Sequence, residues 1–310
     1  MGSESRNRYL LKNTLIFTLG NIGSRMISFF LIPLYTNVLT TSQYGTVDLI
    51  TTISTVAGPM LTLNIAESVM RFGLDKDADK EKNTQCGSIV LLIAMIIGLV
   101  LIPICRCITE VSDYAMYVYF YVISLSASQL FLCDLRGKEL LLKYSLGNIL
   151  QTLMIAILNI TFLLVFKMET GGYLLAYIIA NFIVAIYAII AGKGYKAFSF
   201  HNIDRCKLKE MIRYSIVLIP NTFMWWIMNS SDRVMVTYMI GAAANGIYAV
   251  SYKLPTLVST LTGIFNQAWS YSAIREEGTS DETEYNNKMF KTLSAIAFMM
   301  GIGLLLLTKP

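Results

Sequence analysis

Charged and hydrogen-bonding side chains interrupt a long apolar region near residue 233. The stretch NSSDRVMVTYMIGAAANGIYAVSYKLP, residues 229–255, carries Asn229, Asp232, Arg233 and Lys253. A guanidinium forms paired, charge-assisted hydrogen bonds with phosphate oxygens, and an ammonium adds a point charge. The stretch therefore predicts a site for an anionic group. The alternative is a structural ion pair, in which Asp232 pairs with a cation on another helix.

Further polar side chains occur at helical spacing in the other apolar segments. Arg25 lies near the middle of the first segment and shares a helical face with Asn21. Asp48 heads a polar stripe in the second segment, and Asn266 belongs to a stripe that follows Lys253. A charge at bilayer depth costs roughly 2.5 to 3.5 kcal/mol on insertion scales, so each is a candidate functional residue. The predicted substrate-binding residues are Arg25, Arg233, Lys253, Asn21, Asn229, Asp48, Asp232 and Asn266.

The second apolar segment contains two further local signals. Pro59 follows Gly58, which predicts a kink that opens a groove. Glu67 and Arg71 lie one turn apart, which predicts an ion pair between neighbouring turns of one helix.

The sequence lacks the motifs of common catalytic and metal sites. Its five cysteines form no C-x-x-C pair, its only histidine is His201, and no glycine-rich phosphate loop follows a strand. We therefore expect no catalytic residues, no metal and no cofactor, and we expect that the protein is not an enzyme.

Composition indicates an all-α, polytopic integral membrane protein. The 310 residues are 55% hydrophobic and 15% charged, with a mean hydropathy of +0.56. Apolar segments of about 20 residues, the length that a helix needs to cross a bilayer, recur along the chain. The sequence predicts nine spans, at residues 14–36, 45–70, 87–108, 113–135, 145–167, 171–192, 213–240, 246–273 and 289–308.

The basic residues predict the orientation of these spans. Nineteen of the 25 lysines and arginines fall in predicted loops on one side and three on the other, with Arg25, Arg233 and Lys253 inside spans. Short loops rich in Lys and Arg stay cytoplasmic, so we expect a cytoplasmic N-terminus in the inner (plasma) membrane. The cations are spread over loops that face anionic lipid, so they predict contact with membrane lipids and no nucleic-acid partner.

Three stretches resemble the polysaccharide-transporter family, the Wzx-type O-antigen flippases of the multidrug/oligosaccharidyl-lipid/polysaccharide superfamily. They are GNIGSRMISFFLIPLYTNVLTTSQYGTVDL (20–49), LRGKELLLKYSLGNIL (135–150) and SSDRVMVTYMIGAAANGIYAVSYKLP (230–255). The resemblance implies two six-helix lobes related by pseudo-twofold symmetry. It predicts an N-terminal lobe at 1–192, a cytoplasmic linker at 193–212 and a partial lobe of three helices at 213–310. Because the family usually has about twelve to fourteen spans, the resemblance also implies a C-terminally truncated chain.

The resemblance supplies an expected function. It implies a flippase that moves a lipid-linked oligosaccharide, with a polyprenyl-diphosphate lipid, across the cytoplasmic membrane by alternating access during cell-surface polysaccharide biosynthesis. A coupling ion, H⁺ or Na⁺, is an expected partner. The alternatives are a drug/cation antiporter, favoured by Asp48 and Glu67, a peptidoglycan-precursor flippase, and an integral-membrane polysaccharide polymerase or ligase.

Overall fold

The computed structural model describes residues 27, 30–75, 78–106, 112–198, 204–253, 255–256 and 259, and short stretches at 287, 290–295, 298–299 and 301–303. The chain divides into two units, Met1–Ala249 and Val250–Pro310. The first unit contains every element named below. Arg25, Asn21 and Asn266 lie outside the described residues. The lobe and linker boundaries expected from the sequence stay predictions.

The described residues of the first unit form helices and no strands. The longer helices are α3 (Thr41–Leu61), α5 (Lys80–Arg106), α6 (Ala115–Gly137), α7 (Leu141–Ile160), α8 (Glu169–Ala191) and α9 (Arg205–Met239). The shorter elements are α2 (Ile32–Val38), α4 (Ile65–Gly73), η1 (Ser112–Tyr114), η2 (Thr161–Val165) and η3 (Gly194–Phe198). A further helical stretch of this unit covers residues 242–249. The predicted all-helical class is confirmed for the described part of the chain.

Local sequence explains where the two helices of the candidate site begin. Thr40 caps α3: its hydroxyl accepts a hydrogen bond from the Gln43 backbone N–H, and the Gln43 side chain accepts one from the Thr40 N–H. This reciprocal arrangement satisfies two of the backbone donors that a helix start leaves open. Asp204 caps α9 by accepting a hydrogen bond from the Lys207 N–H at 3.0 Å.

The predicted second span, 45–70, is broken into α3 and α4, which meet at an angle of 60°. Pro59 lies in the last turn of α3, and the kink expected at Gly58–Pro59 falls a few residues later. Leu63 and Asn64 adopt left-handed backbone conformations, with φ of 53° and 54°, and turn the chain there. Asparagine tolerates this conformation better than most residues, because its short side chain can bond locally.

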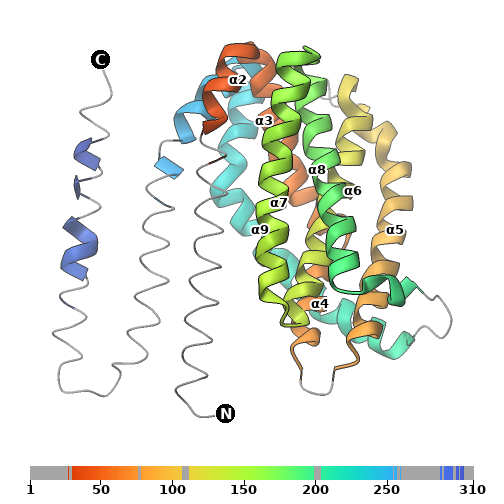
Figure 1. The fold of residues 1–310 in the computed structure, drawn as a ribbon. Coiled ribbons are helices and arrows are strands. Elements are labelled where there is room, and N and C mark those ends of the chain that lie inside the picture. Colours follow the sequence, from red (N-terminus) through yellow and green to blue (C-terminus); the bar gives the residue numbers. More distant parts are fainter. Residues whose placement is uncertain are drawn as a thin grey trace. The chain divides into compact units, whose positions relative to one another are not determined.

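Helix α6 lies at the centre of the first unit. It packs against α3, α4, α5, α7 and α8, and α3 and α4 also pack against α9. In Figure 1, α6, α7 and α8 run side by side. The buried apolar cluster comes from α4, α5, α6, α8 and α9, and includes Ile65, Val69, Val90, Leu130, Leu135, Val184 and Met211. This core holds together the helices that carry the polar residues described below.

Four helices of the described residues are long and apolar enough to span a membrane, or five if the bent pair α3 and α4 is one span. These four are Lys80–Pro103, Ser112–Gly137, Leu141–Val165 and Glu169–Ala191. Large apolar side chains stay exposed on them, such as Ile96 and Val100 on α5 and Val165 at the end of η2, as expected for lipid contact. α9 is not among the four, and the other expected spans lie wholly or partly outside the described residues. The count of nine therefore stays a prediction.

Candidate functional site

An ion pair joins α3 to α9. Arg233 Nη1 donates to Asp48 Oδ1 at 2.9 Å, and the same nitrogen lies 3.5 Å from the Thr52 hydroxyl. The side chains are 15% and 6% exposed, respectively, for Arg233 and Asp48. Removing one member of such a buried pair leaves the other charge uncompensated, which is costlier than losing both. The sequence predicted both residues as site members, and the structure brings them together.

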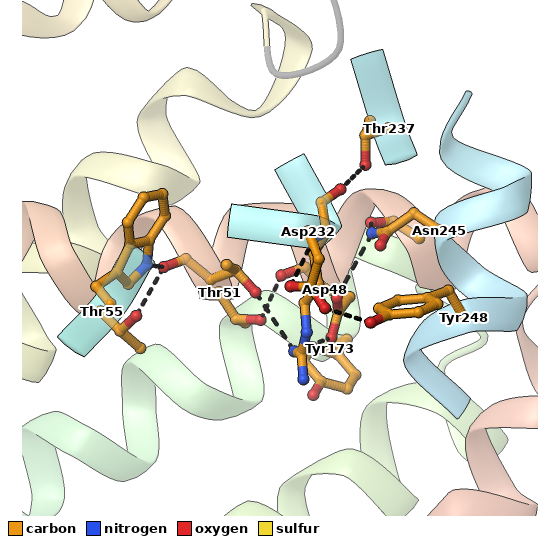
Figure 2. Close-up of polar contacts among 12 residues, drawn as sticks. Asp48, Thr51, Thr55, Tyr173, Asp232, Thr237, Asn245 and Tyr248 are labelled. Carbon is orange, nitrogen blue, oxygen red and sulfur yellow. Dashed lines mark hydrogen bonds and ion pairs between the residues drawn. The ribbon is translucent and has the colours of Figure 1, made fainter. Parts of the chain in front are cut away.

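Asp232, the neighbour of Arg233, takes a different partner. Its carboxylate accepts a hydrogen bond from the Tyr248 hydroxyl, and its other oxygen accepts one from the Arg233 backbone N–H at 3.0 Å. Figure 2 shows Tyr248 pointing at Asp232 and Asn245 pointing at Asp48. Two residues adjacent on a helix point about 100° apart, so the two side chains reach separate groups. The sequence left open an ion pair between Asp232 and a cation on another helix. The inter-helix ion pair found between these elements instead joins Arg233 to Asp48.

Asn245 adds a hydrogen bond between the start of α3 and the helical stretch 242–249. Its amide nitrogen donates to the Gly45 carbonyl at 2.9 Å and lies 3.5 Å from Asp48 Oδ2. Trp226 strengthens the α3–α9 contact, because its indole N–H donates to the Thr52 carbonyl at 2.9 Å.

The backbones at this crossing approach very closely. A Cβ added at Gly45 would lie 1.8 Å from the Ala242 carbonyl oxygen, and one added at Gly246 would lie 2.0 Å from the Thr41 carbonyl oxygen. No other residue type fits either position without separating the helices. The two glycines therefore let Asn245 and Tyr248 reach the charged residues.

A group of buried tyrosines lies beside this site. Tyr35 of α2 stacks with Tyr44 of α3 at 6.1 Å between ring centroids and meets the edge of Tyr173 of α8 at 4.9 Å. Tyr173 in turn stacks on Tyr177 at 4.8 Å and donates to its hydroxyl at 3.1 Å. These rings tie α2 and α8 to the beginning of α3.

The remaining predicted site residues are placed as follows. Asn229 is exposed on α9 and donates to the Trp225 carbonyl at 2.7 Å. Lys253 belongs to the second unit, where its backbone carbonyl accepts a hydrogen bond from Thr256.

Sequence reasoning missed Asn245, Tyr248 and Trp226 as members of this site. Asn245 lies between the predicted spans 213–240 and 246–273, and Tyr248 lies at the start of the second of them. The sequence signal for this contact was a glycine near the start of each helix, Gly45 and Gly246, because small residues mark close helix crossings.

A second polar region lies toward the opposite end of α3. It is a cavity of about 640 Å³ at the joint between α3 and α4, bounded also by α6, α7 and α9. Glu67 lines it, and the predicted pair between Glu67 and Arg71 is wrong: Arg71 instead pairs with Asp75 at 2.5 Å. The α4 helix ends soon after Arg71, so this side chain can reach forward to Asp75 beyond the helix end.

Chemically, the described side chains of these two regions are suited to binding polar and ionic groups. Among the described residues, no group of three or more His, Cys, Asp or Glu side chains could hold a metal ion. Asp48, Asp232 and Arg233 can bind or exchange ionic partners, and the cavity can hold a polar ligand.

The fold and these sites define an all-helical membrane protein with paired charges between its helices. Residues 10–274 match the polysaccharide biosynthesis protein family, and the chain belongs to that family. No curated protein and no solved structure matches the chain.

Proposed function

We propose that this chain is a flippase that moves a lipid-linked oligosaccharide across the cytoplasmic membrane for polysaccharide biosynthesis. The observation that carries the proposal is the family match over residues 10–274 in a chain with several apolar, membrane-length helices. A polyprenyl-diphosphate lipid fits the expected substrate, because its phosphates are anionic and its tail stays in hydrocarbon.

In this proposal the diphosphate binds Arg233, and phosphate binding by Arg25 and Lys253 stays a prediction from the sequence. Arg233 already donates to the Asp48 carboxylate, so the lipid phosphate must replace this carboxylate on the guanidinium. The guanidinium forms charge-assisted hydrogen bonds with both carboxylates and phosphates, so the exchange replaces one such bond with another of the same kind. Because the Asp48–Arg233 pair joins α3 to α9, its exchange is coupled to the packing of these two helices.

The alternating-access cycle follows from this exchange. With Asp48 bound to Arg233, the α3–α9 contact is closed, and phosphate binding releases it. We place the protein in the inner (plasma) membrane with its N-terminus in the cytoplasm, surrounded by membrane lipids. H⁺ or Na⁺ is the proposed coupling ion.

Reconstitution tests the proposal. The intact purified protein is placed in liposomes that contain a polyprenyl-diphosphate glycan with a dithionite-sensitive fluorophore on the sugar. Flipping makes the inner-leaflet pool accessible to external dithionite, and we expect this pool to disappear with the protein and to persist without it.

A fluorescent phosphatidylethanolamine is the specificity control. Equal movement of both lipids, or of neither, would contradict a lipid-linked oligosaccharide flippase. Ethidium uptake driven by a Na⁺ or H⁺ gradient in the same liposomes would instead favour the drug/cation antiporter.

A further inference from the structure

The cavity at the α3–α4 joint has a lining distinct from that of the ion-pair site. Its 640 Å³ falls in the range of small-molecule sites, roughly 300 to 1,000 Å³. Asp48 and Pro59 are eleven residues apart on α3, so the two regions are separated by about 16 Å along the helix. The cavity is therefore a separate site within the first unit.

Uncharged amides dominate the polar part of this lining. Gln129 of α6, Asn148 of α7 and Asn221 of α9 all border the cavity, and no hydrogen bond of their side-chain amides occurs among the described residues. Two other amides of the lining form hydrogen bonds between helices: Asn64 donates to Thr222 at 3.3 Å and Gln151 to Asn181 at 2.6 Å. Three amides thus keep donors and acceptors for a ligand.

Glu67 is the charged residue of the cavity lining, which includes no Lys, Arg or His. Within the described ranges its carboxylate makes no hydrogen bond or ion pair, and the side chain is half-buried. A phosphate would be repelled by this carboxylate and would find no cation among the described residues of the lining itself. The cavity is also far larger than a single bound cation needs.

Sugar hydroxyls match this set of groups. Each hydroxyl both donates and accepts, so neighbouring hydroxyls can bond an amide through its oxygen and nitrogen, while a carboxylate accepts from two of them. Tyr144 borders the same cavity and offers an aromatic surface for the apolar face of a sugar ring, with Arg136 lying 5.4 Å from its ring centroid.

We propose that this cavity binds a sugar unit of the glycan through Glu67, Gln129, Asn148 and Asn221. The inference rests on the proposed function, since it divides the substrate between two places: the diphosphate at the arginine site and a sugar at the amide cavity.

Cys133 provides a reporter, because it lines the cavity. The intact protein is prepared with its other four cysteines replaced by alanine, and the alkylation rate of Cys133 is followed with a small maleimide. Glucose, galactose, mannose, rhamnose and N-acetylglucosamine are added separately, with proline at equal osmolality as the control. We expect at least one sugar to slow labelling by about threefold or more at several times its dissociation constant, as mass action requires.

Matched variants test whether the protection of Cys133 is specific to the cavity. The exposed Cys206, kept as the only cysteine in a second protein, should react at the same rate with and without sugar. Glu67→Gln with Asn148→Leu should abolish the protection of Cys133. If Cys133 reacts too slowly to follow, Ser128→Cys reports from the same cavity.

Three outcomes would overturn the sugar site: no sugar protects either reporter, protection survives in the Glu67→Gln/Asn148→Leu variant, or Na⁺ protects and sugars do not. The liposome assay separates this inference from the proposed function. Protection without flipping contradicts the flippase and keeps the sugar site, whereas flipping without protection contradicts the sugar site alone.

Discussion

Gly45 and Gly246 make reciprocal contacts with each other's helices. Gly45 faces the Ala242 carbonyl and Gly246 faces the Thr41 carbonyl, so each glycine lies four residues after the carbonyl that its counterpart meets. Reciprocal contacts of this kind between two equivalent segments are characteristic of a twofold relationship. The crossing is thus locally twofold within the first unit.

A larger side chain at either glycine should separate the two helices. We expect Gly45→Leu and Gly246→Leu each to destabilise the protein by about 1 to 3 kcal/mol or more, as overpacking does. Thermal unfolding of the detergent-solubilised protein measures the effect. Gly301→Leu is the control, since a Cβ there meets nothing within 4 Å among the described residues. Equal loss in the control and in the two crossing variants would refute the close packing.

The Asp48–Arg233 pair should show compensation between its two members. Arg233→Ala leaves Asp48 buried without its cation, which costs roughly 3 to 5 kcal/mol, and membrane abundance should fall. Asp48→Asn combined with Arg233→Ala should recover abundance, because no buried charge is left without its partner.

The control for this pair is Asp232→Asn combined with Arg233→Ala, which keeps Asp48 charged and should not recover abundance. Immunoblots of isolated membranes give the measurement. Normal abundance of Arg233→Ala would show that the pair is not structural and would favour a purely ligand-binding role for Arg233.

Lys138 should stabilise the packing of three helices. Its ammonium binds Asp134 at 2.6 Å and the Gly192 carbonyl at 2.9 Å, and Asp134 also accepts from the Thr84 hydroxyl. The Lys138 and Asp134 side chains are only 12% and 4% exposed. Lys138→Met should therefore lower the unfolding temperature, because it leaves a buried carboxylate without its cation.

The exposed pair between Lys82 and Asp79 supplies the comparison for Lys138. These side chains are 50% and 53% exposed, and such pairs contribute little. Lys82→Met should shift the unfolding temperature far less than Lys138→Met. A similar shift from both variants would argue against a structural role for Lys138.

The orientation can be tested at opposite ends of the first unit. The α4–α5 and α6–α7 connections and the start of α9 lie at one end in Figure 1, and the stretch after α9 lies at the other. Cysteines near Lys80 and Lys138, and the exposed native Cys206 beside Lys207, should react only from the cytoplasm. A cysteine at the exposed Ala243 should react only from outside. Labelling of the sites near 80 and 243 from the same side would contradict this topology.

Hydropathy predicted the strongly apolar helices well. The expected spans 113–135 and 171–192 correspond to α6 (Ala115–Gly137) and α8 (Glu169–Ala191) within about two residues, since side-chain transfer to lipid dominates there. α5 begins seven residues before the expected 87, because hydropathy detects the apolar part of a helix and not its polar first turns. The expected 45–70 span contains a break, which lies a few residues after the kink predicted at Gly58–Pro59, because hydropathy is insensitive to the left-handed Leu63 and Asn64.

The sequence predicted the residues of the candidate site but not which of them contact each other. Periodicity placed Asp48 on a polar stripe and Arg233 on another, but 185 positions separate them, and their meeting depends on how α3 packs on α9. Glu67 shows the same limit: its spacing to Arg71 allowed an ion pair, yet the end of α4 directs Arg71 to Asp75. Local spacing therefore identifies polar faces, whereas packing selects the contacts.

The bend between α3 and α4 has a mechanical consequence. Backbone hydrogen bonds cross it, from the Asn64 N–H to the Pro59 carbonyl and from the Leu63 N–H to the Met60 carbonyl, and Thr62 adds a side-chain bond to Gly58. These hydrogen bonds hold α3 and α4 at their angle of 60°. If the Asp48 end of α3 moves and this angle is kept, α4 must move with it, so a change at the ion pair would reach the cavity lining that contains Glu67.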